Sequence, residues 1–389
     1  MRASRVIVVG AGIGGLTAAL ALARSGQQVR VFEQSPTLGE VGAGLSVTPN
    51  AGRALASLGL TAELERIGST PPAGAIRHYQ SGETLVTLAQ DRSRETYGMP
   101  LYHVHRADLH ASLLSALRAH DSASIETGKP LRVLRQEGGN VVAEFADGST
   151  ATGDWLVGAD GIHALSRAQL FGDDKPNFTG YVAWRGLIPG ESVDPQLLQP
   201  ALCMTVGPRR MLMRYPLRRG ALINFVAIAR RGAWMEEGWS VPATLDEVLD
   251  EFADFEPRVR QLLVLTPPER LFKWGLFDRD PLPTWHSGRV LLLGDAAHPM
   301  PPFTGQGAVM AIEDGVVLGR AAELSADPGE AIRRFEVARQ GRVNHALQMS
   351  RARSELYFAD DPAQQVRALG AGMAELRTLY DYDAASISL

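Results

Sequence analysis

The stretch RVIVVGAGIGGLTAALALARSGQQVRVFE, residues 5–33, decides the fold of this chain. Residues 5–9 are mostly β-branched and apolar, which predicts a strand buried on both faces of a parallel sheet. Residues 16–24 are rich in Ala and Leu and predict a helix, and residues 29–32 predict a second strand. Strand, glycine-rich turn, helix and strand in this order indicate a Rossmann-like unit that binds a dinucleotide.

Three glycines of the turn, Gly10, Gly12 and Gly15, form the pattern G-x-G-x-x-G. Gly10 permits the tight turn, Gly12 lets the backbone approach a pyrophosphate, and Gly15 lets helix and strand pack closely. The pyrophosphate is expected at the helix N-terminus, where N–H groups and the helix dipole favour anions. Glu33, 23 positions after Gly10, is placed to bind the adenosine ribose. The expected nucleotide contacts in this unit are Gly10, Gly12, Ile13, Gly14, Gly15, Glu33 and Gln34.

Composition narrows the class of protein. The 389 residues, 45% of them hydrophobic and 21% charged, are typical of a globular enzyme with a large core. The net charge of −4 gives no attraction for nucleic acid or anionic membranes, so neither is expected as a partner. The run 6–23 is interrupted by four glycines, so we expect neither an export signal nor a membrane helix. Cys203 is the single cysteine, which predicts a buried, inert thiol and a reducing, cytoplasmic setting.

Two distant segments favour FAD over NAD as the dinucleotide. Residues 155–158 predict a buried strand, which is followed by Asp160-Gly161. Residues 287–293 predict another, which ends at Gly294-Asp295 and continues through a Pro- and Gly-rich loop into a helix at 308–320. An acid at the end of such a strand can bind a ribityl hydroxyl. N–H groups around residues 304–307 can face the flavin ring edge, where the helix dipole stabilises the negative charge of a reduced flavin.

Three motifs are now established: the glycine-rich turn with Glu33, the Asp160-Gly161 segment and the Gly294-Asp295 segment. Together they resemble the single-component FAD-dependent aromatic hydroxylases, the group that includes p-hydroxybenzoate and salicylate hydroxylases. The resemblance covers residues 5–353, nearly the whole chain. Within the group, salicylate, 3-hydroxybenzoate and 6-hydroxynicotinate hydroxylases are the most similar. The segments that carry this closer similarity are Gly42-Ala43-Gly44, Gly305-Gln306-Gly307-Ala308 and Ala311-Ile312-Glu313-Asp314.

The resemblance implies an α/β fold: a Rossmann-like FAD-binding domain, an interposed antiparallel-sheet substrate domain and a C-terminal helical segment. The FAD-binding domain would be discontinuous. The implied segments are 1–72, 100–178 and 275–325 for the FAD-binding domain, 73–99 and 179–274 for the substrate domain, and 326–389 for the helical segment. Hairpin spacing independently predicts antiparallel strands at 181–188, 202–206, 211–216 and 221–229, and a hairpin at 131–145.

The resemblance also implies the roles of several site residues. Arg106 and Asp160 are expected near the FAD diphosphate, with Asp160 also near the path of the reductant. Asp295 is expected at the ribityl chain. The further expected FAD contacts are Gly44, Pro302, Gly305, Gln306, Gly307 and Ala308.

The implied activity is a hydroxylation that depends on NADH or NADPH and on O2. The nicotinamide cofactor reduces FAD, O2 forms a flavin C4a-hydroperoxide, and its distal oxygen attacks an electron-rich ring. The implied substrate is a small aromatic or N-heteroaromatic compound, such as a phenolic or hydroxypyridine-type acid. The sequence has no second nucleotide fingerprint, so the reductant is expected to bind transiently. We expect a monomer or a homodimer.

One departure from the most similar hydroxylases leaves the substrate open. The 6-hydroxynicotinate and salicylate types carry a His where this chain has Phe303, and Ser46 stands at another polar position of the 6-hydroxynicotinate type. A deprotonated phenol reacts faster, so the missing His leaves the catalytic base unidentified. The alternatives are a related monooxygenase of a urate-type purine, an alkene or a polycyclic compound, and a flavin oxidase.

The candidates for the substrate pocket are Tyr215, Gln306, Arg185 and Arg214, beside Phe303. Phe303 lies in the Pro- and Gly-rich loop from Asp295 to Ala308, which we call the flavin loop. Tyr215 is placed to hold a substrate hydroxyl, although a Tyr at the edge of the core fits equally well. Arg185 or Arg214 could pair with a substrate carboxylate, or each could form a surface salt bridge.

Outside these motifs, we considered three histidines as metal ligands and Asp108 as a helix cap. His103, His105 and His110 lie close together, but neither Cys nor acid at ligand spacing accompanies them, so no metal site is expected. Asp108 is a plausible N-cap of the helix that follows these histidines.

The arginines outside the pocket are interpreted as solvated. This applies to the turn residues Arg209, Arg210, Arg218 and Arg219. It applies equally to the long helix predicted from Asp327 onward, whose expected basic face consists of Arg333, Arg334, Arg339, Arg342, Arg351 and Arg353.

Overall fold

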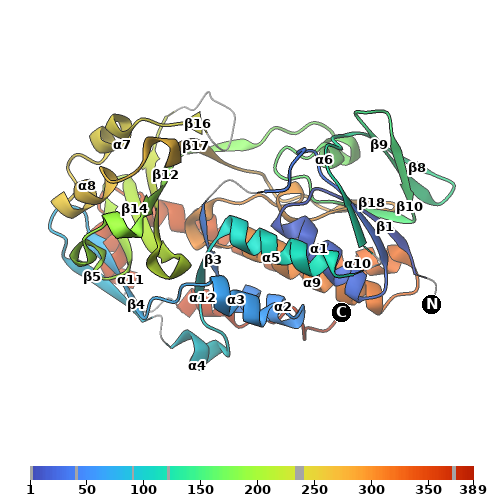
Figure 1. Cartoon of the computed structure of the whole chain (residues 1–389), viewed down its shortest axis with the longest axis horizontal. Coiled ribbons are helices and arrows are strands. Elements are labelled where there is room, and N and C mark those ends of the chain that lie inside the picture. The colour runs from blue at the N-terminus through green and yellow to red at the C-terminus, as the bar shows by residue number, and fades with distance from the viewer. Residues whose placement is uncertain (1–2, 40–42, 90–91, 121–122, 233–240, 370–373) are drawn as a thin grey trace.

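The computed structural model describes residues 3–39, 43–89, 92–120, 123–232, 241–369 and 374–389. Gly42, in one of the segments most similar to known hydroxylases, lies outside these ranges. The described chain forms two bodies that lie side by side along the longest axis, each built on one large sheet (Figure 1). The α/β fold class inferred above is confirmed.

A six-stranded sheet forms the first body, and β1 lies near its centre. The neighbours β1 and β2, β1 and β11, β11 and β19, and β2 and β7 are parallel, whereas β18 is antiparallel to β19. In sheet order the strands are β18 (His286–Ser287), β19 (Val290–Leu292), β11 (Trp155–Gly158), β1 (Arg5–Val9), β2 (Gln28–Phe32) and β7 (Ala123–Glu126). The strands predicted at 5–9, 29–32 and 155–158 are therefore confirmed.

Two helices cover this sheet side by side, α1 (Ile13–Arg24) and α9 (Gly307–Glu323). Small residues let them approach closely: a Cβ on Gly315 would lie 2.7 Å from the Ala18 nitrogen, and one on Gly319 would lie 2.6 Å from Ala21 Cβ. The later residue of α9, Gly319, contacts the later residue of α1, Ala21, so α1 and α9 run parallel and begin at the same end. That shared end carries both the glycine-rich turn and the flavin loop.

Smaller elements surround the first body. The strands β3 (Gly44–Val47) and β6 (Tyr102–His105) pair with each other, and β8 (Leu131–Glu137), β9 (Asn140–Phe145) and β10 (Thr150–Gly153) form a three-stranded sheet. The hairpin predicted at 131–145 is thus confirmed. The remaining helices of this body are α2 (Pro49–Ser57), α3 (Thr61–Ile67), α4 (Ser93–Tyr97), α5 (Arg106–Arg118) and α6 (Leu165–Phe171).

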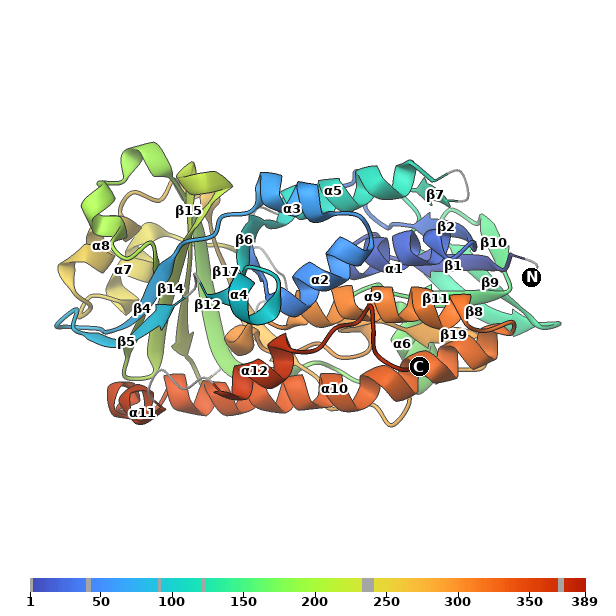
Figure 2. The same ribbon diagram turned by 90° about the horizontal axis from the view of Figure 1, so that it is seen from below.

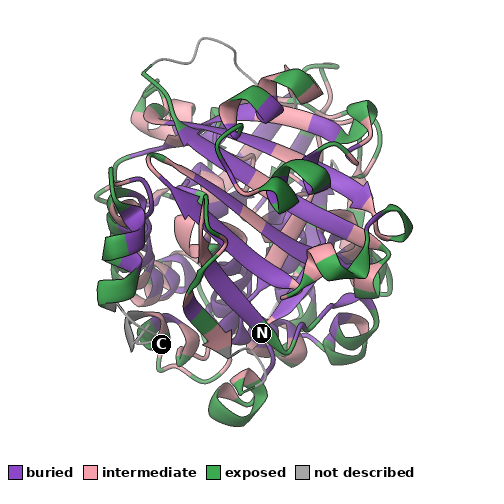
Figure 3. Ribbon diagram, turned by 90° about the vertical axis from the view of Figure 1, so that its left-hand side faces the viewer, coloured by how far each residue is buried: buried purple, intermediate pink, exposed green. Residues whose placement is uncertain are grey.

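An eight-stranded sheet forms the second body, and the four predicted antiparallel strands are confirmed in it. Its strands are mostly buried where they cross the body, while exposed residues gather on the surrounding helices and loops (Figure 3). In sheet order the strands are β16 (Val241–Pro242), β17 (Leu271–Asp278), β12 (Asn177–Pro189), β15 (Leu222–Arg230), β14 (Arg210–Leu217), β13 (Leu202–Gly207), β4 (Ala73–His78) and β5 (Thr84–Ala89). The exact boundaries of the FAD-binding domain, the substrate domain and the C-terminal helical segment stay predictions.

The two faces of this sheet pack against different parts of the protein. One face packs on α7 (Leu245–Glu251) and α8 (Pro257–Leu263) through an apolar cluster that includes Trp184 and Phe225. The other face, which carries Tyr181 and Ile228, packs on Phe303 of the flavin loop. A substrate bound between this second face and the flavin loop would therefore contact both bodies.

Helix α10 (Pro328–Tyr357) connects the bodies, because its 30 residues run along both of them (Figure 2). The helices α11 (Pro362–Leu369) and α12 (Ala374–Tyr380) follow it. The interpretation of its arginines as a solvated face is wrong for Arg339 and Arg353, which are 0% and 6% exposed. Both lie on the side of the helix that packs on the protein, and Arg339 forms ion pairs with α9. No helix within the described residues is long and apolar enough to cross a membrane.

Asp108 does not have the predicted role at the start of α5. The N-cap residue is His105, and Asp108 lies in the first turn of the helix. Its carboxylate accepts two hydrogen bonds from Arg218, from Nε at 2.9 Å and Nη2 at 2.7 Å. Arg218 is exposed, as expected of a solvated turn charge, and its ion pair also connects the β14–β15 turn to the first body. Both Arg218 and Arg219 have left-handed backbone angles, with φ of 48° and 58°.

Candidate active site

The glycine-rich turn between β1 and α1 has the close backbone contacts expected of a dinucleotide-binding loop. Gly10 has a φ of +102°, and a Cβ on it would lie 2.3 Å from the carbonyl oxygen of Ala159. A Cβ on Gly15 would lie 2.0 Å from the carbonyl oxygen of Gly10. Gly12 differs, because a Cβ there would meet no described atom within 4 Å. Gly10 and Gly15 are thus required by packing, whereas Gly12 leaves space beside the loop.

The N-termini of α1 and α9 are open to a ligand. The side chains of the N-cap residues, Gly12 and Gln306, form no capping hydrogen bond within the described part of the chain. The first turn of each helix, which the structure describes completely, contains no acidic residue. The two ends are adjacent: a Cβ on Gly14 would lie 3.0 Å from Ala311 Cβ. Free N–H groups and aligned dipoles at two neighbouring helix ends suit a diphosphate at one and an electron-rich ring edge at the other.

Two side chains brace the glycine-rich turn. Glu33 accepts hydrogen bonds from the backbone N–H groups of Ala11, at 2.7 Å, and Ser35, at 2.9 Å. His110 Nε2 donates to the carbonyl oxygen of Ala11 at 2.8 Å. Sequence reasoning considered His110 only as a metal ligand, because nothing in the sequence places α5 beside the turn. The predicted contact of Glu33 with a ribose stays a prediction, as does that of the exposed, neighbouring Gln34.

The Asp160-Gly161 segment follows β11 and is held from within the protein. The Asp160 carboxylate accepts hydrogen bonds from the backbone N–H of Ser166, at 3.0 Å, and from its hydroxyl. Burial raises the pKa of Asp160, which Ser166 opposes. Nearby, Arg167 donates to the carbonyl oxygens of Ala296 and Ala297, at 3.3 and 3.0 Å. This segment is thus fastened to the turn that carries Asp295.

The flavin loop runs from Asp295 to Ala308 and leaves its backbone accessible. Pro302 and Gly305 are exposed, and Gly307 and Ala308 are half-buried. Gly305 has a φ of +66°, and a Cβ on it would meet no described atom within 4 Å. In contrast, the side chain of Gln306 is fully buried and directed to the Thr304 carbonyl oxygen at 3.4 Å. Any contact of Gln306 with a ring would therefore be made by its backbone.

Arg185 and Tyr215 lie on the sheet face that packs on the first body. Arg185 on β12 pairs in register with Val226, and Tyr215 on β14 pairs with Asn224. The Arg185 guanidinium carbon lies 5.0 Å from the ring centroid of Trp274, a cation–π distance. The predicted candidates Arg185 and Tyr215 are thus brought onto one face.

Arg214 lies on the opposite face, because successive residues of a strand point to opposite sides. It is buried and donates to the carbonyl oxygen of Ala201 at 3.2 Å. Burial lowers the pKa of Arg214. Cys203, its register partner, is buried as predicted, and burial raises the pKa of its thiol. Arg214 therefore does not join Arg185 and Tyr215.

Phe303 belongs to an aromatic cluster between the flavin loop and α10. Its ring centroid lies 5.2 Å from that of Tyr181 and 5.3 Å from that of Phe358, both edge-on. The position at which similar hydroxylases carry a His is thus apolar and packed in this chain.

The polar surroundings of Tyr215 come from β3 and β6. The His103 ring stacks on the Tyr215 ring at a centroid distance of 4.4 Å, and His103 Nδ1 is hydrogen-bonded to Ser46 Oγ at 3.0 Å. The N–H of Gly44 donates to Asn224 Oδ1 at 2.9 Å, and a Cβ on Gly44 would lie 2.8 Å from the Tyr215 hydroxyl. Gly44, predicted as an FAD contact, therefore also borders Tyr215. Sequence reasoning considered His103 only as a metal ligand, because its contact with Tyr215 depends on the packing of distant segments.

Burial lowers the pKa of His103 to about 3, so its imidazole stays neutral near pH 7. A His in the unfolded chain titrates near 6.5, so on acidification the unfolded state takes up a proton that the folded state does not. The neutral His103 therefore contributes fully to stability above the pKa that His has in the unfolded state. This contribution is lost as the pH falls toward the pKa of His103 in the folded state. From pH 7 to pH 5 the wild type should lose about 2 kcal/mol of unfolding free energy relative to His103→Phe, which cannot titrate. Denaturant unfolding of both proteins at both pH values measures this, and an unchanged difference would contradict a neutral, buried His103.

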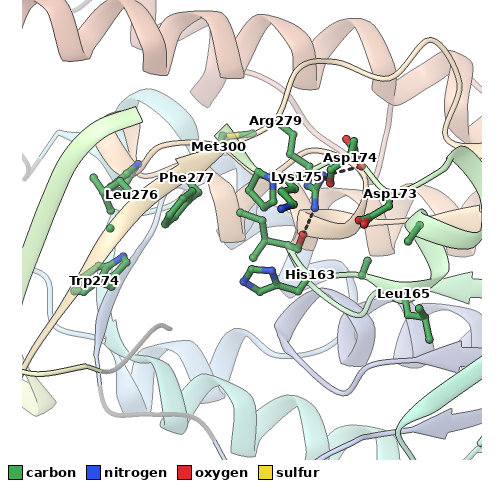
Figure 4. Close-up of a pocket in the computed structure, with 16 residues that line it drawn as sticks. His163, Leu165, Asp173, Asp174, Lys175, Trp274, Leu276, Phe277, Arg279 and Met300 are labelled. Carbon is green, nitrogen blue, oxygen red and sulfur yellow. Dashed lines mark hydrogen bonds and ion pairs between the residues drawn. The ribbon is translucent and has the colours of Figure 1, made fainter. Parts of the chain in front are cut away.

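A cavity of about 430 Å³ lies between residues 162–165, which follow Asp160-Gly161 in the chain, β17 and the flavin loop. His163, Lys175, Arg279, Trp274 and Met300 are among the residues that line it, as Figure 4 shows. Arg279 is held in place by an ion pair of 2.7 Å with Asp174 and a hydrogen bond of 2.9 Å to the Ile162 carbonyl oxygen. His163 and Lys175 are exposed, so their polar ends are available to a bound molecule.

Comparisons with known proteins agree with this geometry. The sequence pattern of the family described as FAD binding domain matches residues 3–346. The chain is 36% identical to 3-amino-4-hydroxybenzoate 2-monooxygenase of Streptomyces platensis, over 98% of this chain and 97% of that protein. It is also 36% identical to 3-hydroxybenzoate 6-hydroxylase 1 of Aquipseudomonas alcaligenes, over 94% and 92% of the two chains.

Solved structures show the same fold. The structure of Klebsiella pneumoniae HpxO with FAD and uric acid is similar with a TM-score of 0.88 and 30% identity, over 97% of this chain and 96% of that one. A substrate complex of salicylate hydroxylase is similar with a TM-score of 0.82 and 29% identity, over 98% and 96%.

Proposed function

Because the chain belongs to the FAD-binding-domain family of aromatic hydroxylases and is an FAD-dependent monooxygenase, we propose that it hydroxylates a small aromatic or N-heteroaromatic acid bearing a ring hydroxyl. NADH or NADPH and O2 are its co-substrates. The observation that carries the substrate class is the common sheet face of Arg185 and Tyr215. The similar proteins that act on 3-amino-4-hydroxybenzoate and 3-hydroxybenzoate support it.

The residues around the turn and the flavin loop fit FAD. We assign the AMP half to Gly12 and Glu33, the ribityl chain to Asp295, and the ring end to the backbone of residues 302–308 beside Gly44. Open space at Gly12 and Gly305 and the uncapped starts of α1 and α9 support this seat. FAD bound there would take electrons from the nicotinamide cofactor and activate O2, while the protein supplies position, dryness and charge.

Arg185 and Tyr215 would fix the two ends of the substrate. They are two strands and two residues apart on one face, which places their Cα atoms roughly 12 Å from each other. Val226 and Met213 lie between them in register, so the floor of the site is apolar. A carboxylate would pair with Arg185, and a ring hydroxyl would meet Tyr215.

Tyr215 and its neighbours would act on the substrate hydroxyl as uncharged groups. Burial raises the pKa of Tyr215, so its phenol stays protonated and can donate a hydrogen bond. A donor directed at the substrate oxygen favours the phenolate form of the substrate, which is the more reactive one. This gives Tyr215 part of the task that a His performs in similar enzymes, where this chain has Phe303.

A urate-type purine is a second candidate substrate, and Phe303 is the observation that favours it. The aromatic cluster at Phe303 adds an apolar wall to the site. The similar HpxO structure contains uric acid. An anionic purine would use Arg185 as a carboxylate does, so the two classes are separated by assaying aromatic acids and urate side by side.

The reductant is proposed to dock in the cavity that His163 and Lys175 line. Its diphosphate is anionic, and Lys175 supplies a positive charge on the wall of this cavity. We expect Lys175→Gln to raise the KM for the nicotinamide cofactor about tenfold, the loss of a hydrogen bond to a charged group, without changing FAD content. Steady-state kinetics with Arg132→Gln, which alters an exposed charge on β8, provide the control. An unchanged KM for Lys175→Gln would place the reductant elsewhere.

The proposed function is tested by substrate-stimulated oxidation of NADH and NADPH across aromatic acids, hydroxypyridine acids and urate. Product mass decides the reaction, because hydroxylation adds one oxygen atom. Stoichiometric peroxide with an unmodified organic compound would instead indicate a flavin oxidase.

A further inference from the structure

A cluster of charged residues lies inside the protein beneath the flavin loop. It consists of Glu313 and Asp314 on α9 and Arg339 and Arg342 on α10. Arg339 Nη1 lies 2.7 Å from Glu313 Oε2, and Arg339 Nε lies 2.8 Å from Asp314 Oδ1. Arg342 Nη2 lies 2.7 Å from Glu313 Oε1. The side chains of Glu313, Asp314 and Arg339 are 0% exposed.

The cluster is balanced in charge, with two carboxylates against two guanidinium groups. Burial opposes the charge of Arg339, but the adjacent carboxylates of Glu313 and Asp314 raise its pKa overall. Asp314 is also buried, and the neighbouring His298 and Arg339 lower its pKa. Arg339 and Asp314 are therefore held in their charged forms. Removing one charged side chain of the cluster leaves its partner uncompensated in a medium of low dielectric constant.

One carboxylate of the cluster holds the start of the flavin loop. Asp314 Oδ2 lies 2.7 Å from His298 Nε2, and it accepts a hydrogen bond from the N–H of Gly294 at 3.3 Å. Gly294 directly precedes Asp295, the residue assigned to the ribityl chain. Asp314 thus fixes the turn on both sides of Asp295.

The other carboxylate holds the end of the loop through a relay. Glu313 Oε1 accepts a hydrogen bond from Asn50 Nδ2 at 2.7 Å, and Asn50 Nδ2 lies 3.5 Å from Gln306 Oε1. Gln306 is the N-cap of α9, where the ring end of FAD is assigned. Each acid of the cluster therefore supports a different end of the flavin loop.

We propose that this buried cluster is a positioning and tuning device for FAD: it holds both ends of the flavin loop, and its charge balance sets the reduction potential of the bound cofactor. The proposal rests on the FAD seat assigned above. It makes Glu313 and Arg342 functional residues although neither belongs to the loop, and it assigns the buried side of α10 a role beyond packing.

The charges of the cluster predict the direction in which each substitution shifts the reduction potential of bound FAD. Reduction adds negative charge to FAD, so a protein that has lost a buried negative charge favours the reduced form. Glu313→Gln should raise the reduction potential of the bound FAD, and Arg342→Gln should lower it. A purely structural role would not move the two variants in opposite directions. Arg334→Gln is the matched control, because Arg334 lies on the same helix in a partly exposed pair with Glu330, where solvent and salt screen its charge.

Spectroelectrochemical titration of the FAD-loaded proteins measures the potentials, and circular dichroism checks the fold. Opposite shifts for Glu313→Gln and Arg342→Gln, with Arg334→Gln at the wild-type value, are expected. Equal values or shifts in the same direction would overturn the proposal. If either variant does not fold, Asn50→Ala breaks the relay without a change of charge, and it must weaken FAD binding in a fluorescence titration or the proposal is overturned. A wild type that binds no FAD would refute the seat itself, which is a separate outcome.

Discussion

Replacing Gly12 with Val is expected to abolish FAD binding and leave the fold of the protein intact. A Cβ on Gly12 meets no described protein atom within 4 Å, so the substitution finds room within the polypeptide. The space it enters is the one assigned to the FAD diphosphate at the start of α1, where the backbone must approach the phosphates closely. The purified variant should be colourless, with an unfolding midpoint close to that of the wild-type apoprotein.

The matched control is Gly341→Val on α10, because Gly341 is also exposed to open space but lies far from the turn in sequence. It should retain the flavin absorbance of the wild type. Gly15→Val tests the other role of glycine, since a Cβ there would lie 2.0 Å from the Gly10 carbonyl oxygen and should destabilise the apoprotein as well. A yellow Gly12→Val protein would remove the diphosphate from this position.

Replacing Arg185 with Met is expected to lower kcat/KM for an aromatic acid about a hundredfold, close to 3 kcal/mol, because a desolvated carboxylate loses its partner. Met retains much of the length of the side chain over the Trp274 ring and removes the charge together with the guanidinium donors. Steady-state kinetics at saturating NADH or NADPH measure the effect on the acid that the wild type turns over best.

The control for Arg185→Met is chemical. The uncharged amide of the same substrate cannot form the ion pair, so its kcat/KM should fall little in the variant. Equal losses for the acid and the amide would show that Arg185 supports the sheet and does not bind the carboxylate. FAD content should remain that of the wild type, since Arg185 lies outside the assigned FAD seat.

The sequence predicted those parts of the fold and the site that depend on neighbouring residues. The turn at residues 10–15, its strand and its helix are contiguous, so spacing and propensity were sufficient to predict them. The antiparallel strands of the second body were predicted because alternation and turn residues are local signals. The family and the FAD cofactor followed from three motifs in the right order and are confirmed.

What the sequence did not predict depends on how distant segments pack. The arginines of α10 alternate with apolar residues, and nothing local shows that Arg339 faces the carboxylates of Glu313 and Asp314. The stacking of His103 on Tyr215 joins residues 112 positions apart, because β6 pairs with β3 and packs against β14. These contacts required tertiary structure.

The sequence left Arg185 and Arg214 as equal candidates for binding a substrate carboxylate, and the register of the strands distinguishes between them. Arg185 and Arg214 both lie on strands, and only the pairing with β15 shows that Arg185 shares a face with Tyr215. Asp108 was misassigned for a related reason: the helix begins earlier, at Arg106, and an arginine from the other body pairs with Asp108.

We expect the protein to insert one oxygen atom from O2 into an aromatic acid at the expense of NADH or NADPH. The most direct measurement is mass spectrometry of the organic product formed under isotopically labelled O2 by the FAD-loaded protein. We expect a product that carries one labelled oxygen atom and is formed in proportion to the reductant consumed. Reductant consumption that yields only peroxide with every aromatic acid and with urate, and no labelled organic product, would contradict it.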